Sequence, residues 1–292
     1  MSEETKKDVK RIASNIKIPK SSPQCRFPSD VLKHMKKKAS PKKALKLMKL
    51  NKFFLQEKCP FIHFGGLTIF RDSVIPEFLA SKQKTYPINN LPNNIGIGDA
   101  LILRLLFKAE YLSHFISKII ICDIKQLICY KLRILYDEFK FLTSSGKVKK
   151  VELEETFVTS KKDEIISYAE LLGLVPSLTH LKLDYYDDAI SQKFVEKICA
   201  SNLERLELCR LTDEFDFEEF LTSMKRKPNL EISLNFLKSV NGKKIDAYID
   251  KLVAAGIPDS YPPYLRGSSS QNGFSLNRLR QIYQKSVLSH NK

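Results

Sequence analysis

The sequence predicts an α/β protein in which a short helical segment precedes alternating strands and helices that form a parallel sheet. An apolar phrase, with hydrophobic residues at its first, fourth and sixth positions, recurs from Ile116 onward and predicts short strands at repeated intervals. Helical patterns of apolar residues fill the intervals between copies of the phrase. Two Pro-led helix starts near the N-terminus predict the helical segment.

The helical segment spans residues 25–56 and contains two helix starts. Pro28 stands where a missing N–H is harmless, and Asp30 lies near the positive end of the helix dipole. Ser40 and Pro41 repeat the signal as an N-cap and a first helical residue. Apolar residues follow at helical spacing, namely Val31, Leu32, Met35, Ala44, Leu45, Leu47, Met48, Leu50 and Phe54. A unit of this size cannot hold a core alone, so we expect it to pack on the rest of the chain or on a partner.

These residues carry a family resemblance. The F-box pattern runs through Leu-Pro, an acidic residue, a Val/Ile-Leu pair, a further apolar position, a Pro and an apolar run that closes on an aromatic. Residues 25–56 resemble this pattern, and the chain is similar to the divergent F-box families of nematodes. Ala39 and Ala44 replace larger aliphatic residues of the family, and residues 36–38 make the loop unusually basic.

The resemblance implies that the segment docks on the Skp-type adaptor subunit of a cullin ubiquitin ligase. The residues that this resemblance assigns to the contact are Phe27, Pro28, Val31, Leu32, Met35, Pro41, Leu45, Leu50 and Phe54. Skp adaptors are acidic as a family, so a basic face on this segment is electrostatically complementary to them.

The region of strands and helices, including its N-terminal cap, spans residues 57–255, and the repeated phrase recurs within it. Its copies begin at Ile116, Val148, Leu178 and Leu203, and a degenerate copy begins at Leu230. The last two apolar positions of each copy alternate at period two, as in a strand with one buried face, while the first lies under the preceding turn. We therefore expect Leu181, Leu183, Leu206 and Leu208 to point into one continuous core.

Helices are expected between the phrases, at residues 163–174, 190–199 and 217–224. Pro176, Asn202 and the pair Pro228-Asn229 end these helices just before the next strand. The alternation resembles an irregular leucine-rich-repeat-like solenoid with a parallel sheet, because right-handed crossovers return each strand beside its predecessor. An ordinary α/β domain with coincidental leucine spacing is the alternative interpretation.

Three flanking regions complete the organisation. Residues 1–24 are expected to form a basic, disordered tail. Residues 57–113 are expected to form the N-terminal cap, with short strands or one strand around Gly65-Gly66 and a helix over Asp99–Phe107. Residues 256–292 are predicted to form a linker and a C-terminal tail. A short basic helix over Leu276–Leu288 is the alternative to a loosely held tail.

The net charge of +16 is concentrated in one part of the chain. Residues 1–60 contain 17 basic and 5 acidic residues, a net of +12, which leaves +4 for the other residues. A local basic block attracts nucleic-acid phosphates, anionic lipid or an acidic protein by the same Coulomb interaction. A solvated, Lys-rich tail without a partner explains the same composition.

Composition also bears on location and redox state. The longest apolar run, residues 100–107, is interrupted by Arg104, so nothing approaches the roughly 18 apolar residues of a membrane span. We expect a cytoplasmic or nuclear protein. The six cysteines form no CxxC pair, which argues against a zinc ribbon and favours free thiols.

The sequence shows no catalytic or metal-binding constellation. The histidines are scattered and form no HExxH motif. Gly96-Ile97-Gly98 begins like a dinucleotide-binding loop, but Leu101 occupies the place of the third glycine. We therefore expect no catalytic residue, no metal site and no cofactor, and we expect that the protein is not an enzyme.

One polar and aromatic cluster follows a predicted strand and is a candidate surface for a target protein. The cluster comprises Asp184, Tyr185, Tyr186, Asp187 and Asp188, and its two tyrosines beside three acids form an amphipathic patch suited to a basic partner. Arg210 follows the next predicted strand. Aromatic side chains lose little entropy on binding and are enriched at interface hot spots. A solvated turn with one buried tyrosine is the alternative interpretation.

The function predicted from these features is a substrate-recruiting adaptor of a Skp/cullin/F-box-type ubiquitin ligase, which binds an unidentified target protein through the repeat region. A nucleic-acid-binding protein with a basic N-terminal arm is the first alternative. Against it, Phe27, Phe53 and Phe54 have core-like spacing and are not interleaved with lysines on an exposed face. A leucine-rich interaction scaffold without ligase contact is the second alternative.

Overall fold

The structure is a computed structural model, and it describes residues 28–39, 41–50, 54, 61–76, 85–104, 109–186, 190–240, 242–267 and 270–290. The chain divides into two compact units. Unit 1 comprises Met1–His63, Pro92–Gly96 and Lys118–Ile120, and unit 2 comprises Phe64–Leu91, Ile97–Ser117 and Ile121–Lys292. The predicted tail at residues 1–24 lies outside the described residues.

Unit 1 contains the two helices that the sequence predicted, α2 (Ser29–Lys38) and α3 (Pro41–Leu50). Pro28 occupies the N-cap position of α2, and the extended backbone of Ala39 ends the helix. Leu32, Ala44 and Phe54 are buried. The two Pro-led starts therefore begin two short helices, as their sequence signals indicate.

Unit 2 contains nearly all of a mostly parallel sheet, and only residues 62–63, 95–96 and 119–120 of its strands belong to unit 1. Its parallel strands are β4 (Ile95–Arg104), β6 (Gln126–Tyr130), β8 (Lys150–Glu154), β10 (His180–Asp184), β11 (Arg205–Leu211), β12 (Glu231–Phe236) and β13 (Tyr264–Arg266), paired in this order. At the other edge, β1 (Ile62–Phe70), β2 (Ser73–Pro76) and β3 (Tyr86–Pro87) pair antiparallel in turn. Short β5 (Ile119–Cys122) pairs with β4, and β7 (Arg133–Leu135) pairs with β9 (Phe157–Thr159) in a separate small sheet.

A repeated hydrogen-bond pattern fixes the register of the parallel strands. The carbonyl of Lys125 accepts from the N–H groups of Lys149 and Lys150, at 2.8 and 3.1 Å. The carbonyl of Lys149 accepts in the same way from Thr179 and His180, both at 2.9 Å. Each strand therefore starts at the same level as its neighbour, which aligns Leu127, Val151, Leu181, Leu206 and Ile232 in one row across the sheet.

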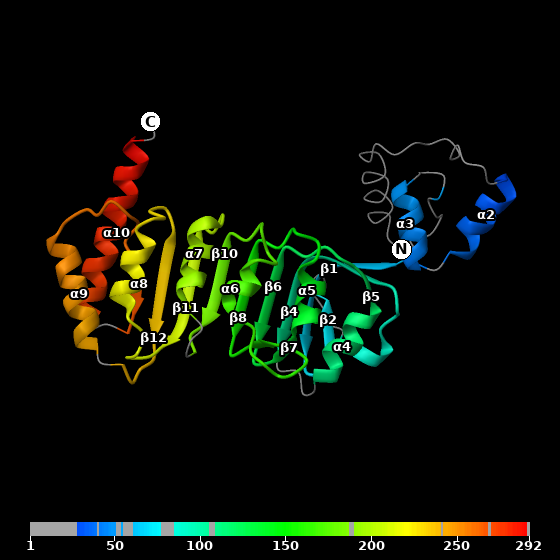
Figure 1. Cartoon of the computed structure of the whole chain (residues 1–292), viewed down its shortest axis with the longest axis horizontal. Coiled ribbons are helices and arrows are strands. Elements are labelled where there is room, and N and C mark those ends of the chain that lie inside the picture. The colour runs from blue at the N-terminus through cyan, green and yellow to red at the C-terminus, as the bar shows by residue number, and fades with distance from the viewer. Residues whose placement is uncertain are drawn as a thin grey trace. The chain divides into compact units, whose positions relative to one another are not determined.

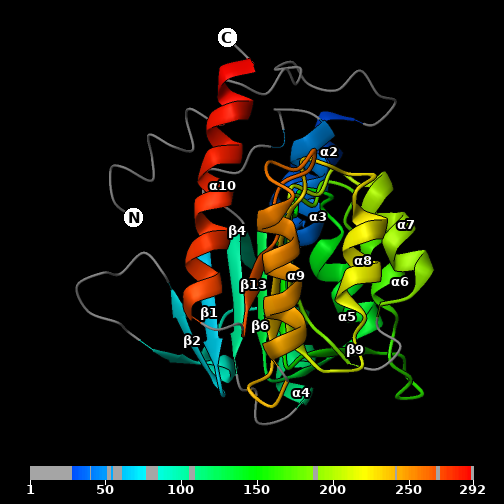
Figure 2. The same cartoon turned by 90° about the vertical axis from the view of Figure 1, so that its left-hand side faces the viewer.

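Helices cover one face of this sheet (Figures 1 and 2). They are α5 (Tyr136–Thr143), α6 (Tyr168–Leu172), α7 (Gln192–Ala200), α8 (Phe217–Met224) and α9 (Gly242–Ala254), and α4 (Ala109–Lys118) precedes β5. Side chains of Ser167, Ser191 and Asp216 cap α6, α7 and α8 by accepting from the backbone N–H three residues later. These caps satisfy N–H groups that have no partner inside the helix.

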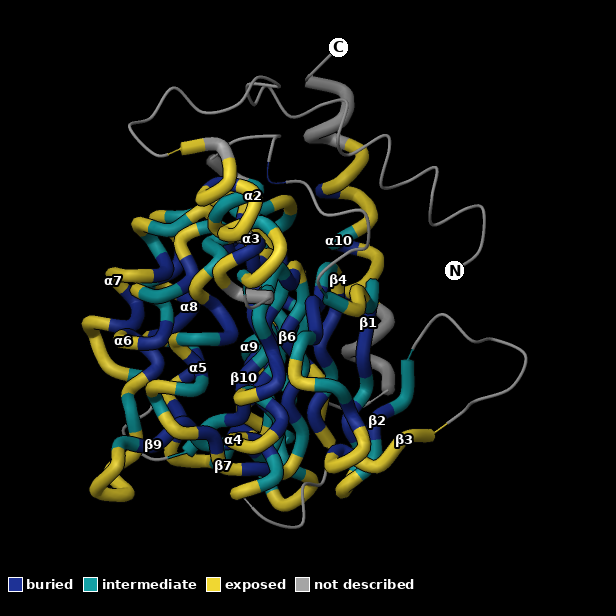
Figure 3. The backbone as a smooth tube through the Cα atoms, turned by 90° about the vertical axis from the view of Figure 1, so that its right-hand side faces the viewer, coloured by how far each residue is buried: buried dark blue, intermediate teal, exposed yellow. Residues whose placement is uncertain are grey.

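The core lies between the sheet and these helices. Leu181, Leu183, Leu206 and Leu208 are all buried, as the repeated phrase predicted. Phe139 and Phe194 pack from α5 and α7 and are also buried. In Figure 3, buried positions line the strands and the inner sides of α6 to α8, and exposed positions follow the outer turns.

Two sequence-based expectations were wrong. The helix expected over Asp99–Phe107 is the strand β4, which ends at Arg104. A continuous apolar run of this length does not distinguish a buried strand from a helix. The first copy of the repeated phrase, at Ile116, falls at the end of α4 and the start of β5. The copy that builds the main sheet is Ile124, Leu127 and Cys129, and all three are buried.

The C-terminal region is more ordered than the linker and tail predicted for residues 256–292. Residues 264–266 form β13, and α10 (Ser270–His290) packs against α9 and β13. Leu276, Leu279 and Tyr283 are buried. α10 lies across the sheet from α6, α7 and α8 (Figure 2). Among the described helices, none combines the length and the apolar character needed to cross a bilayer.

Candidate functional site

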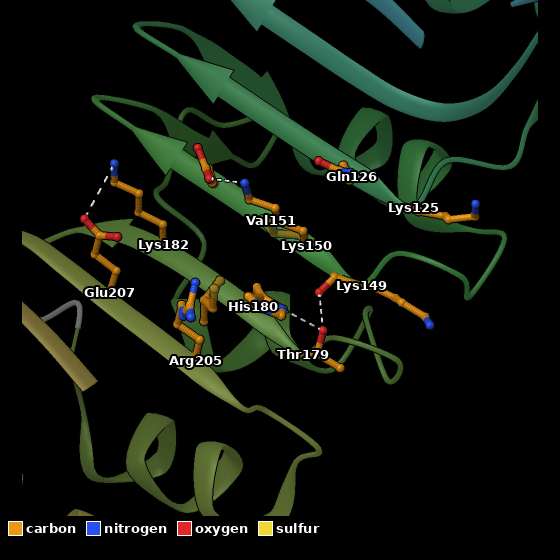
Figure 4. Close-up of a pocket in the computed structure, with 12 residues that line it drawn as sticks. Lys125, Gln126, Lys149, Lys150, Val151, Thr179, His180, Lys182, Arg205 and Glu207 are labelled. Atoms are coloured by element: carbon orange, nitrogen blue, oxygen red, sulfur yellow. Dashed lines mark hydrogen bonds and ion pairs between the residues drawn. The ribbon is translucent and has the colours of Figure 1, made fainter. Parts of the chain in front are cut away.

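The face of the sheet opposite α5 to α9 carries charged side chains, and we call it the open sheet face. Because side chains alternate along a strand, the residues next to the buried leucines point to this face. They include Lys150, Glu152 and Glu154 of β8, His180 and Lys182 of β10, and Arg205 and Glu207 of β11. Figure 4 shows Lys150, His180, Lys182, Arg205 and Glu207 on one side of the strands.

Ion pairs between neighbouring strands order this face. The Lys182 ammonium lies 2.9 Å from Glu154 Oε1 and 3.7 Å from Glu207 Oε1. Partial burial disfavours the charged ammonium, but the hydrogen bond to Glu154 and the Glu207 carboxylate outweigh burial, so the pKa of Lys182 is raised. Arg205 pairs with Glu231 at 2.8 Å. The central lysine therefore stays charged and holds three strands together.

A groove of about 490 Å³ lies at the N-terminal ends of β6, β8, β10 and β11. Its lining residues are Lys125, Gln126, Lys149, Lys150, Val151, Glu152, Thr179, His180, Leu181, Lys182, Arg205 and Glu207. Lys125 pairs with Asp99 at 3.1 Å, whereas the exposed Lys149 ammonium has no ion-pair partner among the described residues. The groove is therefore rich in cations, and one of them is available to a ligand.

Thr179 joins His180 to the residue that precedes β8. The Thr179 hydroxyl donates to the carbonyl of Lys149 at 3.1 Å, and its oxygen lies 2.8 Å from His180 Nδ1. These contacts fix the position of the imidazole ring at the N-terminal end of β10. The Lys149 side chain extends away from this ring (Figure 4).

The opposite, C-terminal ends of the strands hold a second polar group. The carboxylate of Asp184 accepts from the N–H of Glu155 at 2.8 Å, and Arg210 Nε lies 3.8 Å from it. Burial raises the pKa of Asp184, and the Glu155 N–H and the Arg210 guanidinium oppose this rise. Glu155 and Arg210 both have positive φ, of 45° and 61°. This cluster is a structural junction between neighbouring strand ends.

The structure brings three of the four predicted target-binding residues to this edge. The N–H of Tyr185 donates to the carbonyl of Cys209 at 2.7 Å, which places Tyr185 beside Arg210. The Tyr185 ring lies 5.2 Å from Phe215, and the Tyr186 ring lies 5.1 Å from Tyr168. Both tyrosines are half-buried and pack on neighbouring rings. Asp187 lies outside the described residues.

The residues predicted to contact the Skp adaptor divide into three groups. Pro28, Val31 and Met35 are exposed on α2, with Val31 and Met35 each 36% exposed. Leu32 and Phe54 are each only 4% exposed and face inward. Phe27, and the side chains of Pro41, Leu45 and Leu50 in α3, lie outside the described residues. An exposed apolar stripe on α2 is therefore available for contact, and Leu32 serves packing.

Two further hollows lie among the helices, and sequence patterns gave no signal for either. A hollow of about 360 Å³ between α7 and α8 has Tyr185, Phe215 and Phe220 in its lining. A larger one, of about 660 Å³, lies between α8 and α9, where Leu221, Tyr248 and Leu252 contribute to a mostly apolar lining. Such hollows depend on how far neighbouring helices separate, which single-sequence periodicity does not encode.

The described residues contain no cluster of His, Cys, Asp and Glu that could hold a metal ion. Four described cysteines are free thiols. Burial raises the pKa of Cys122 to about 12 and that of Cys209 to about 11, and it raises the pKa of Cys129 as well. A thiol with a raised pKa is a poor nucleophile, because the thiolate is the reactive form. These three cysteines therefore serve packing.

Comparison with protein-family models found no match for this chain, and neither did comparison with curated proteins.

Proposed function

We propose that this protein is a non-enzymatic, substrate-recruiting adaptor of a Skp/cullin/F-box-type ubiquitin ligase. In this proposal α2 and α3 dock on a Skp-type adaptor, and an irregular leucine-rich-repeat-like solenoid in unit 2 presents a target protein. The adaptor acts by proximity, because a tethered target reacts at a high effective concentration. The proposal needs no cofactor and places the protein in the cytoplasm or nucleus.

The exposed apolar stripe on α2 is the observation that carries the adaptor proposal. Val31 and Met35 lie one helical turn apart and are both exposed, while Leu32 between them faces inward. The ten-residue helix α2 thus carries apolar side chains on two sides and buries only the side of Leu32, so the other side is exposed to a partner. Lys33, Lys37 and Lys38 are exposed on the same helix and complement an acidic adaptor.

The repeat proposal is supported by the order and the register of the strands. From β8 to β12 the main strands follow the chain, each is parallel to the last, and a helix lies between successive strands from β8 onward. The backbone carbonyls of Lys125, Lys149 and Thr179 repeat the same hydrogen-bond pattern at successive strand starts. In this architecture the open sheet face is a continuous, ordered surface across several repeats, which suits binding of a target.

Co-purification of the full chain with a Skp-type adaptor tests the proposal. We expect the intact chain to bind and Met35→Asp to bind at least tenfold more weakly, because a carboxylate in an apolar contact loses its hydration. Ile257→Asp makes a matched change at an exposed loop position of unit 2 and should bind like the unaltered chain. Leu32→Asp is unsuitable as a docking test, since Leu32 is buried.

Two outcomes contradict the proposal. A folded, intact chain that fails to bind any Skp-type adaptor refutes ligase recruitment and favours the scaffold without ligase contact. Equal loss of binding in Met35→Asp and Ile257→Asp means that α2 is not the docking site. Far-UV circular dichroism of each variant separates loss of docking from loss of fold.

A further inference from the structure

We propose that the groove at the N-terminal ends of β6, β8, β10 and β11 binds an acidic segment of a partner protein, with carboxylates spaced along an extended chain. The inference rests on the proposed function in one respect, namely that the target protein presents this segment. It adds the chemical class of the target, which the adaptor proposal leaves open.

The groove has more cationic than anionic side chains in its lining. Five cationic side chains, Lys125, Lys149, Lys150, Lys182 and Arg205, line it against two carboxylates, Glu152 and Glu207. Lys149 is exposed and has no ion-pair partner among the described residues. Lys125 and Arg205 have side chains 59% and 55% exposed, so their existing ion pairs are weak and can be exchanged for a ligand carboxylate.

The spacing of the cations across the sheet matches the spacing of side chains along an extended peptide. The register places Lys150, His180 and Arg205 opposite one another on three adjacent strands. Neighbouring strands lie about 4.8 Å apart, so Lys150 and Arg205 start about 10 Å apart across the sheet. In the extended polyproline II conformation, every third side chain of a peptide lies on the same side, about 9 Å apart. A segment with an acidic residue at every third position can therefore bring successive carboxylates to Lys150, in exchange for its 2.7 Å ion pair with Glu152, and to Arg205. Lys149 extends from the N-terminal edge of the groove (Figure 4).

The two carboxylates in the groove and the lack of Phe and Tyr rings in its lining favour a peptide ligand over a nucleic acid. Glu152 and Glu207 lie two positions further along β8 and β11, where a continuous phosphate backbone would meet them. A peptide carries its charges at discrete positions and can place neutral residues there. No Phe or Tyr lines the groove, so bases would have no stacking platform. A ring nitrogen of His180 can also form a hydrogen bond with a peptide backbone group.

The test uses the full chain and a fluorescent peptide of about twelve residues, with Glu at every third position and Gly or Ser between. A peptide of the same length with Gln in place of Glu is its control. We expect the Glu peptide to bind at physiological salt with at least tenfold preference over the Gln peptide. Lys149→Glu should weaken binding about tenfold, a typical effect of charge reversal beside a ligand charge.

Lys193→Glu is the matched control variant, because Lys193 is exposed on α7 and has no ion-pair partner among the described residues. It makes the same change in net charge, so it reports the contribution of the overall field of this +16 chain. We expect it to reduce binding less than twofold. Equal losses in Lys149→Glu and Lys193→Glu overturn the inference, because the attraction is then not local to the groove.

Single-stranded DNA of matched charge provides the other contrary outcome. Tighter binding of the DNA than of the Glu peptide, with the same dependence on Lys149, assigns the groove to nucleic acid and overturns the inference. The adaptor proposal is judged separately, through Met35→Asp and the Skp-type adaptor. Adaptor binding without peptide binding refutes only the acidic target segment, and peptide binding without adaptor binding refutes only ligase recruitment.

Discussion

The carboxylate of Asp184 accepts a hydrogen bond of 2.8 Å from the backbone N–H of Glu155, and so joins the ends of β10 and β8. Glu155 has a φ of 45°, a conformation that costs free energy in a residue with a side chain. The Asp184 acceptor satisfies an N–H that the strand ladder does not use. The hydrogen bond therefore stabilises the turn after β8 and offsets part of the cost of burying the Asp184 carboxylate.

Asp184→Asn should stabilise the protein at neutral pH. The folded-state pKa of Asp184 is raised, so its carboxyl group favours folding when protonated and this advantage is lost as pH rises through the folded-state pKa. Asparagine keeps the acceptor oxygen for Glu155 without the buried charge. The gain over the unaltered chain should shrink as the pH falls into the acid range where Asp184 becomes protonated. Urea unfolding at several pH values measures this difference.

Asp184→Ala is the matched comparison and should act in the opposite direction. It removes the acceptor and leaves the Glu155 N–H unsatisfied, which costs about 1 to 3 kcal/mol. An Asn variant as destabilised as the Ala variant would mean that the negative charge itself, through Arg210, is required.

Leu206→Ala should lower the free energy of unfolding by about 2 to 5 kcal/mol, because it leaves a cavity in a completely buried row. Leu206 lies opposite Leu181 and Ile232 in the parallel register, so the cavity opens between three strands. Ile257→Ala, at an exposed loop position, should change stability by less than about 0.5 kcal/mol. Denaturant unfolding of both variants provides the measurement, and equal effects would contradict the assignment of the core.

The leucine phrases could be located from sequence because each combines a strand period with a helix stop nearby. Leu181, Leu183, Leu206 and Leu208 were identified in this way, and all are buried. The copy at Ile124 was missed because Cys129 stands where the others have a leucine, although a buried cysteine packs as a small apolar side chain. The strand β13 was missed, and the helix considered over Leu276–Leu288 was shorter than α10, because the Pro and Ser residues before them are typical of linkers.

The candidate site was less predictable than the fold. The groove with Lys149 and His180 exists because strands from four parts of the chain start at the same level, and no local pattern reveals that alignment. Alternation along β8 and β10 does predict which residues face away from the core. The tyrosines after β10 were correctly placed at a strand end, but periodicity could not show that both pack against neighbouring rings.

The partly buried thiols of Cys122 and Cys209 should resist alkylation in the folded protein. With a pKa of about 11, roughly one Cys209 side chain in a thousand is ionised at pH 8, and Cys122, at about 12, is ionised still less. Mass spectrometry after iodoacetamide treatment at pH 8 should find both unlabelled in the native chain and labelled in urea. Rapid native labelling of Cys122 or of the buried Cys129 would show that the β5 to β6 region opens easily.

Arg280 should contribute to holding α10 on the end of the sheet, together with the buried Leu276, Leu279 and Tyr283. Its guanidinium lies 3.0 Å from Glu231 Oε1 and about 5 Å from the ring centres of Tyr261 and Tyr264, and its side chain is only 13% exposed. Arg280→Ala removes both contacts and leaves Glu231 with Arg205 alone, so it should cost about 1 to 3 kcal/mol.

Arg280→Lys separates the two contributions of this side chain. Lysine keeps the positive charge, but it lacks the planar guanidinium group that stacks on the tyrosine rings while it pairs with Glu231. It should therefore restore only part of the stability that Arg280→Ala loses. Hydrogen exchange should show faster exchange in α10 than in β10 for Arg280→Ala. Uniform acceleration across both elements would contradict a local role, because it would mean that α10 unfolds only together with the whole of unit 2.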